Sequence, residues 1–212
     1  MKKIFNFQTV AHYARYNNTI KKSRFIALVQ EIGDETEART FLKSVQQEFP
    51  DATHHCWAYR LGSGKNEITQ YSDSGEPSNS AGPPILQAIK QEKVTNVIVV
   101  VVRYFGGIKL GISGLIKAYR DTARMGLQQA GKKRKYPMQE FIMEGIEYKS
   151  LGTILQSVES KSGKIEDIQY GEKVNLKALL YPAEEEWIKK LFNNVTQGKA
   201  LIKKGKIKWM TG

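Results

Sequence analysis

The stretch that decides the fold runs from Val97 to Arg124, VIVVVVRYFGGIKLGISGLIKAYRDTAR. It opens with an unbroken β-branched run, Val97 to Val102, which is typical of a strand covered on both faces. Glycines follow from Gly106 to Gly114, and the apolar residues after them recur at helical spacing. The stretch therefore predicts a central strand ending near Arg103, then a glycine loop, then a helix.

The glycine loop has two interpretations. Glycines bring backbone N–H groups close to an oxyanion, and the start of the following helix adds partial positive charge. Alternatively, the glycines only permit a left-handed backbone and close helix packing, which makes the loop a tight turn. We favour a loop that binds an anion or a nucleic-acid backbone, because cations flank it. Its candidate residues are Arg103, Tyr104, Gly106, Gly107, Lys109, Gly111, Ser113, Gly114, Lys117 and Arg120.

A second polar loop runs from Tyr71 to Pro84 and leads into an apolar helix that we expect to begin near Gly82 or Pro83. Asp73 and Glu76 are its only plausible general acid or base pair. Carboxylates at such positions also form turns and complement helix starts, so catalysis is the weaker interpretation. The candidate binding residues of this loop are Asp73, Gly75, Glu76, Ser80 and Gly82.

His54, His55 and Cys56 suggest a metal site at first sight. Consecutive strand residues point to opposite faces, so only His54 and Cys56 can share a site, and no second cluster completes a closed zinc site. We therefore expect packed histidine and cysteine side chains and predict no metal and no cofactor.

The charge of the chain is concentrated in its N-terminal part. The net charge is +12, and residues 136–212 hold 12 Lys and Arg against 10 Asp and Glu, so residues 1–135 carry +10. Such a surface attracts phosphates and acidic partners, although a solubilising role explains the charge equally well. The single cysteine excludes an internal disulfide but leaves the redox compartment nearly open. With no signal peptide and no membrane span in the sequence, we expect a cytoplasmic protein by default.

The remaining N-terminal elements complete a sheet with helices. Residues 18–31 predict one strand with Phe25, Ala27 and Val29 on one face, and Asp34 predicts the capped start of a helix. Residues 53–60 and 67–72 predict two strands joined by a hairpin-type loop at 61–66. This order indicates an α+β sandwich with helices on one side of a sheet.

A basic tetrad, Lys132 to Lys135, marks the expected domain boundary between residues 1–135 and 136–212. We expect it to end the long helix, where cations suit the negative helix end and Pro137 blocks continuation. Residues 138–146, 150–160, 164–170, 173–181, 183–195 and 199–209 then predict strand, helix, strand, strand, helix and strand, a ferredoxin-like order. The lysines of the last strand either contact RNA or protect a sheet edge; they are Lys203, Lys204, Lys206 and Lys208.

Residues 73–86 (DSGEPSNSAGPPIL) and 100–119 (VVVRYFGGIKLGISGLIKAY) closely resemble the two signature stretches of the YigZ/IMPACT family. The resemblance covers the whole chain and implies a cytoplasmic protein tied to translation. For residues 1–135 it implies an α/β sandwich like the second domain of a small-subunit ribosomal protein. For residues 136–212 it implies a domain similar to a module of elongation factor G.

Charge and resemblance together favour a non-enzymatic, translation-associated regulator. Its expected partners are RNA or the ribosome, or else a translation factor or regulatory protein, and no membrane. The alternative is a phosphate- or nucleotide-dependent enzyme that uses the Gly106–Gly114 loop. Phosphoryl transfer also requires a carboxylate that holds a metal, for which only Asp73, Glu76 and Asp121 are candidates.

We predict that residues 73–82 and 103–117 form one site, since helices on one side of a sheet can start along one edge. Asp73 and Glu76 then orient the arginines, and Tyr104 offers a stacking face for a base. The alternative is that Arg103 and Glu76 form a structural ion pair that only holds the two loops together.

Overall fold

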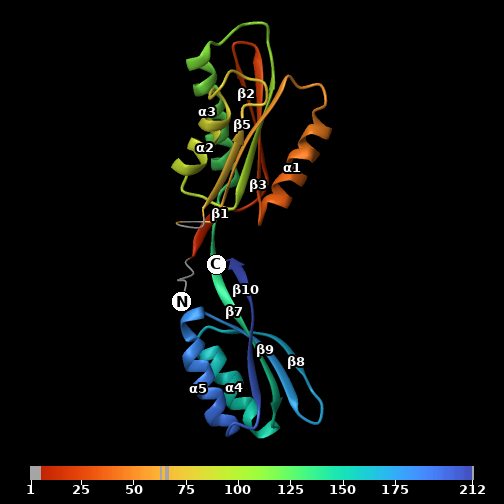
Figure 1. The fold of residues 1–212 in the computed structure, drawn as a ribbon, viewed down its shortest axis with the longest axis vertical. Helices are drawn as coiled ribbons and strands as arrows, with labels where there is room; N and C mark the ends of the chain where they lie inside the picture. Colours follow the sequence, from red (N-terminus) through yellow and green to blue (C-terminus); the bar gives the residue numbers. More distant parts are fainter. Residues whose placement is uncertain (1–5, 63, 65–66, 212) are drawn as a thin grey trace. The chain divides into compact units, whose positions relative to one another are not determined.

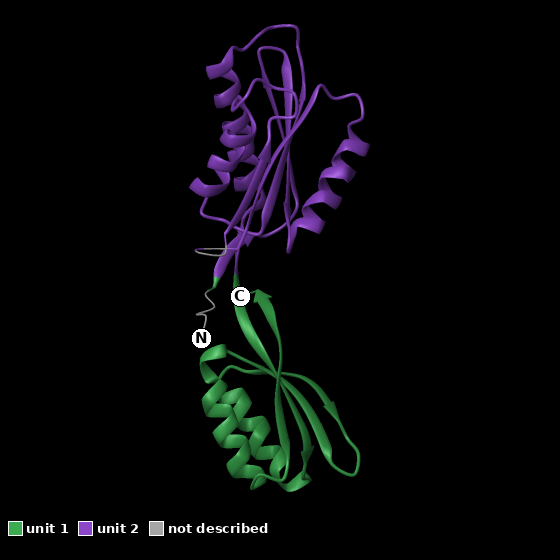
Figure 2. Cartoon of the chain, in the orientation of Figure 1, with its two compact units in different colours: residues 1–6, 135–212 green, residues 7–134 purple. Residues whose placement is uncertain are grey.

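The structure of the protein is a computed structural model that describes residues 6–62, 64 and 67–211. Residues 7–134 form one unit, and Lys135–Gly212 belong to a second (Figure 2). The N-terminal unit contains two hydrophobic cores, and the C-terminal unit contains a third. Ser63, Lys65 and Asn66 of the predicted hairpin loop lie outside the described residues.

An antiparallel five-stranded sheet organises the N-terminal unit. Its strand order is β2 (Ala14–Ile20), β3 (Ser23–Glu31), β6 (Val97–Tyr104), β4 (His54–Leu61) and β5 (Ile68–Ser72). The predicted central strand and the predicted β4–β5 hairpin are therefore confirmed. A short strand, β1 (Phe7–Val10), precedes the sheet, and its Gln8 carbonyl accepts a hydrogen bond from the Thr95 N–H at 2.9 Å.

Alternate residues of β6 belong to two different cores. Val97, Val99 and Val101 pack in the core that includes α2 (Gly82–Gln91) and α3 (Ile112–Ala130). Ile98, Val100 and Val102 pack in the core that includes α1 (Glu35–Glu48). Figure 1 shows α1 on the opposite face of the sheet from α2 and α3. The prediction that the helices lie on one side is therefore wrong, because an apolar run whose side chains alternate between faces needs cover on both.

The strand predicted over residues 18–31 is two strands. Lys21 and Lys22, with φ of 44° and 65°, form the turn between β2 and β3. Two consecutive residues with positive φ are what a tight hairpin turn requires. The predicted apolar face of β3 is confirmed, since one core contains Phe25, Ala27 and Val29.

The start of α1 is the predicted one. The Asp34 carboxylate accepts a hydrogen bond from the Glu37 N–H at 2.9 Å, and the Glu37 carboxylate accepts one from the Gly33 N–H at 2.7 Å. The arrangement resembles a capping box, except that Glu37 bonds the N–H of Gly33, one residue before the N-cap, instead of that of Asp34.

The C-terminal unit has the predicted ferredoxin-like order. Its elements are β7 (Lys132–Ile146), α4 (Tyr148–Ser160), β8 (Lys164–Gln169), β9 (Val174–Leu180), α5 (Glu185–Thr196) after a short 3-10 turn (Pro182–Glu184), and β10 (Leu201–Thr211). Four strands pair in the order β10, β7, β9, β8. The buried face of β9 is the predicted one and contains Val174, Leu176, Ala178 and Leu180. Within the described residues, no helix is long and apolar enough to span a membrane.

The basic tetrad does not end the long helix. α3 ends at Ala130, Gly131 follows with φ of 62°, and Lys132 already belongs to β7. Two of the cations have specific partners, since Lys132 contacts Glu92 at 2.6 Å and Lys133 contacts Glu31 at 2.5 Å. The expectation is wrong because a glycine immediately after a helix is a stronger stop than the cations beyond it.

Candidate functional site

The start of α2 is completed by a carboxylate from earlier in the chain. Asp73 accepts hydrogen bonds from the backbone N–H groups of Asn79, Ala81 and Gly82 at 2.8, 2.9 and 2.8 Å. The residue at the N-cap position, Ala81, supplies no side-chain bond of its own. Asp73 therefore closes the loop and occupies the donors that a bound anion would need.

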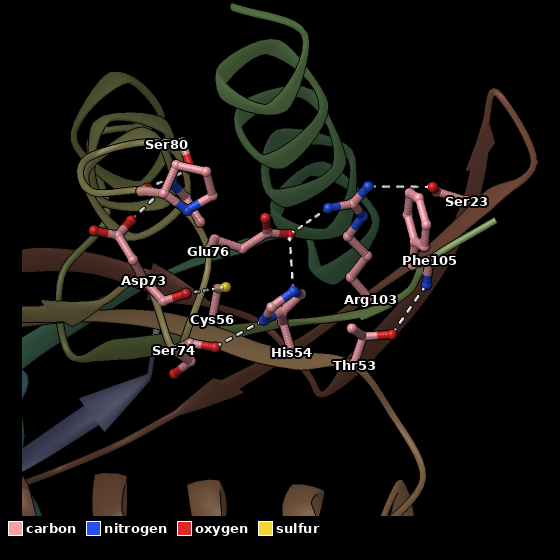
Figure 3. Close-up of polar contacts among 12 residues, drawn as sticks. Ser23, Thr53, His54, Cys56, Asp73, Ser74, Glu76, Ser80, Arg103 and Phe105 are labelled. Carbon is pink, nitrogen blue, oxygen red and sulfur yellow. Dashed lines mark hydrogen bonds and ion pairs between the residues drawn. The ribbon is translucent and has the colours of Figure 1, made fainter. Parts of the chain in front are cut away.

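The same loop is fastened to β4 beneath it (Figure 3). The Cys56 thiol donates to the Asp73 carbonyl at 2.9 Å, and the ring Nδ1 of His54 lies 2.9 Å from the Ser74 carbonyl. Since a carbonyl only accepts, Nδ1 of His54 carries the proton. Burial raises the pKa of the Cys56 thiol to about 12. These contacts account for the predicted packed histidine and cysteine.

A buried ion pair joins the two loops. The Arg103 Nη1 donates to Glu76 Oε1 at 2.6 Å (Figure 3). The Tyr119 hydroxyl donates to the same oxygen at 2.7 Å. The second amino group of Arg103 donates to the Ser23 hydroxyl at 3.3 Å, which accepts the Gly106 N–H at 3.2 Å. Burial raises the pKa of Tyr119, so its hydroxyl remains a donor to the Glu76 carboxylate.

A cavity of about 390 Å³ lies between the two loops. The lining comes from both loops, from the chain around the start of β4 and from the first turns of α3. The lining residues are Thr53, His54, Glu76, Pro77, Arg103, Phe105, Lys109, Leu110, Gly111, Ile112 and Leu115. The structure thus brings Glu76, Arg103, Lys109 and Gly111 together from the sequence-predicted residues.

The start of α3 borders this cavity and has no internal carboxylate. Its N-cap is Gly111, with φ of 77° and no side-chain cap bond, and its first turn contains no acidic residue. The first bond of the helix joins the Leu115 N–H to the Gly111 carbonyl at 3.0 Å. The N–H groups of Ile112, Ser113 and Gly114 therefore have no acceptor within the helix.

The glycine loop also packs against the β2–β3 turn. A Cβ placed on Gly106 would lie 2.1 Å from the carbonyl carbon and oxygen of Lys22, so only glycine fits there. Gly107, with φ of 81°, needs glycine for its backbone conformation instead. This approach puts the exposed cations Lys21 and Lys22 beside the loop that contains Lys109.

Other residues predicted for the site either stabilise the loops or lie outside the cavity lining. Ser80 is buried and donates to the Pro77 carbonyl at 2.6 Å. A Cβ on Gly82 would lie 2.9 to 3.0 Å from Tyr71 and Ser72. Outside the lining lie Asp73, Gly75, Ser80 and Gly82 of the first loop, Tyr104, Gly106 and Gly107 of the second, and Ser113, Gly114, Lys117 and Arg120 of α3.

Tyr104 is not a free stacking platform. The guanidinium of Arg24 lies 4.4 Å from its ring centroid, and its hydroxyl donates to Asp51 at 2.9 Å. The aromatic ring at the cavity is instead that of Phe105, which is 47% exposed. Sequence reasoning missed Phe105, Leu110 and Ile112, although a loop that contains large apolar residues between glycines already signals a surface that is used.

The lysines of β10 mostly have acidic partners. Lys203 contacts Glu144 at 2.8 Å, Lys204 contacts Glu185 at 2.5 Å, and Lys208 contacts Glu166 at 2.6 Å. Hydrogen bonds from Lys189 and Lys204 lower the pKa of the Glu185 carboxyl. These partners favour the interpretation of the β10 lysines as protection of a sheet edge over RNA contact.

Fold and site together define a two-domain α+β protein whose N-terminal unit contains a cavity between two helix-leading loops and whose C-terminal unit is ferredoxin-like. Residues 21–127 match the family described as the Impact N-terminal domain, and residues 145–199 match a domain of unknown function (DUF1949). The chain belongs to the IMPACT family.

Two curated relatives and one solved structure show how far the similarity extends. The IMPACT family member YvyE of Bacillus subtilis is 31% identical over 207 residues, which cover 98% of this chain and 94% of the relative. YigZ of Escherichia coli is 38% identical over 166 residues, which cover 78% of this chain and 81% of the relative. A crystal structure titled as that of a hypothetical protein has a TM-score of 0.70 at 32% identity and covers 94% of this chain and 97% of its own.

Proposed function

We propose that this protein is a non-enzymatic, translation-associated regulator in the cytoplasm that binds RNA, on the ribosome or free, through its N-terminal unit. The binding surface is a basic edge, defined as Lys21, Lys22, Arg24 and Lys109. The observation that supports it is the close approach of Gly106 to the Lys22 carbonyl, which joins two basic segments distant in sequence.

The chemistry of the basic edge suits a nucleic-acid backbone. All four side chains are exposed, and they belong to the part of the chain that carries +10 of the net charge. Lysine and arginine side chains that neutralise phosphates release counterions, which provides affinity without base recognition. The neighbouring ring of Phe105 adds an exposed aromatic surface on which a base can stack.

The positions of the carboxylates favour binding over phosphoryl transfer. Asp73 is held by three backbone N–H groups, Glu76 by Arg103 and Tyr119, and Asp121 lies 3.4 Å from Arg120. A carboxylate in such a contact must exchange it before it can hold a metal ion or accept a proton. The glycine loop is thus better suited to recognition than to phosphoryl transfer.

The test is ribosome co-sedimentation and RNA binding of the full-length protein at two salt concentrations. We expect the double variant Lys21→Glu/Lys22→Glu to bind at least tenfold more weakly. Its log–log salt slope should be smaller by about 0.7 to 0.9 for each lost phosphate contact. The matched control is Lys190→Glu/Lys199→Glu, which makes the same charge change at exposed positions of the C-terminal unit.

Three results would contradict the proposal. Equal losses in the two double variants would mean that net charge alone governs association. Steady ATP or GTP hydrolysis that disappears in Ser113→Ala would show that the glycine loop serves an enzyme. Binding to purified translation factors but not to RNA would replace the RNA partner with a protein.

A further inference from the structure

The cavity between the two loops has the dimensions of a small-molecule site. Ligand pockets occupy about 300 to 1,000 Å³, and this cavity has about 390 Å³. Two of its apolar lining residues are unusually exposed, Phe105 at 47% and Ile112 at 61%. A ligand with an apolar body that covers them removes this surface from water, which favours binding.

The charges around the cavity favour an anion. Among the described residues that line it, Glu76 is the only carboxylate, and it already binds Arg103 and Tyr119. Lys109 lines the same cavity and has no acidic partner among the described residues. The positive charge of Lys109 is therefore not neutralised by a carboxylate of the cavity lining.

Backbone donors at the same place add to this preference. The first N–H groups of α3 have no acceptor within the helix, and Gly111 and Ile112 at its start are themselves part of the lining. The positive end of the helix dipole favours a negative group there. α2 cannot serve in the same way, because Asp73 occupies its donors.

Arg103 gives an independent indication that the polar side of the cavity lining, which contains Arg103 and Glu76, is short of a hydrogen-bond acceptor. The residue lines the cavity and is only 5% exposed, yet its Nε has no hydrogen-bond partner among the described residues. Buried guanidinium donors are normally paired, so the arrangement is short of one oxygen.

We infer that the cavity binds a small organic monoanion, a carboxylate attached to an aliphatic or aromatic body. The carboxylate accepts hydrogen bonds from the first turn of α3 and from Lys109. The body lies against Phe105, Leu110, Ile112 and Leu115. Inorganic phosphate is a poorer ligand, because it offers nothing to the apolar walls. Lys109 belongs both to the basic edge and to the cavity lining, whereas Lys21 and Lys22 do not line the cavity. The variant Lys21→Glu/Lys22→Glu should therefore weaken RNA binding and leave binding in the cavity unchanged, which separates the two proposals.

The experiment titrates the full-length protein with four probes and follows backbone amide shifts by NMR. The probes are phenylbutyrate, phenylbutanol, phenylbutylamine and inorganic phosphate. We expect phenylbutyrate to bind at least tenfold more tightly than each of the other three. The largest shifts should occur at the amides of residues 111–115.

Three variants locate the site. Lys109→Ala should weaken phenylbutyrate about tenfold, since it removes a charge-assisted hydrogen bond, and Ile112→Ser should weaken it by reducing the apolar wall. The control is Lys117→Ala, an exposed lysine of α3 outside the lining, which should leave the affinity unchanged. Failure of phenylbutyrate to bind at millimolar concentration, equal binding of the amine or of phosphate, or an equal effect of Lys117→Ala overturns the inference.

Discussion

α2 and α3 lie on the same face of one sheet and each follows a polar loop, yet their first turns are completed in different ways (Figure 1). At α2 a carboxylate of the chain itself, Asp73, binds the free backbone donors. At α3 the N-cap is a glycine, the first turn has no acid, and a cavity adjoins it. A polar loop before a helix therefore indicates a ligand site only where no carboxylate of the chain already binds the first backbone N–H groups of that helix.

The largest expected effect comes from the contact that joins the two helix starts. Arg103→Ala leaves Glu76 buried without its cation, so the free energy of unfolding should fall by about 3 to 5 kcal/mol. Urea denaturation of the full-length protein measures it. The double variant Arg103→Met/Glu76→Gln should lose less than the single variant, because it leaves no unpaired charge. A loss below about 1 kcal/mol in Arg103→Ala would show that the pair is not what connects the loops.

The second-largest effect is expected at the start of α2, where Asp73 binds the backbone donors. Asp73→Ala removes three charge-assisted hydrogen bonds to backbone N–H groups, and we expect a loss of about 2 to 3 kcal/mol in urea denaturation. Asp34→Ala at the start of α1 is the matched control. Asp34 binds one backbone N–H, so its loss should be about 1 kcal/mol. Equal losses of unfolding free energy in the two variants would show that Asp73 stabilises the start of α2 no more than Asp34 stabilises the start of α1.

The smallest effect is expected at the start of α3, which has no side-chain cap and no acidic residue in its first turn. Ser113→Asp puts a carboxylate in the first turn and should raise the free energy of unfolding by about 0.3 to 1 kcal/mol at low salt. Ser113→Asn has a similar shape without the charge and should give no such gain. The gain should also shrink with added salt, which screens it. A destabilised Ser113→Asp variant would mean that the α3 start is not short of negative charge.

Much of the fold could be predicted from local patterns. The β-branched run of β6 predicts a central strand, and the alternation in β9 predicts its buried face, because side-chain direction follows the backbone period. The sequence does not predict the β2–β3 turn, because its two residues with positive φ are lysines rather than the glycine or asparagine that usually mark such turns. The placement of α1 was also missed, although the apolar run of β6 already required cover on its second face.

The site was less predictable because its contacts span long distances in the sequence. The N-cap bond of Asp34, whose donor lies three residues ahead, can be predicted from the local sequence. Asp73 instead accepts from donors six to nine residues ahead across a turn. The contact between Arg103 and Glu76 was foreseen only as an alternative. The sequence alone does not distinguish Phe105 from the neighbouring Tyr104, because the contact of Arg24 with the Tyr104 ring exists only in the folded chain.

The buried position of Cys56 has a practical consequence for fluorescence and spin-label spectroscopy. It is the chain's only cysteine, and burial raises its pKa to about 12, so the thiol remains protonated at neutral pH. Maleimides react with thiolates, so the folded wild-type protein should remain unlabelled. A cysteine introduced at an exposed position such as Ser113→Cys can then report from one place, with Cys56 left as it is.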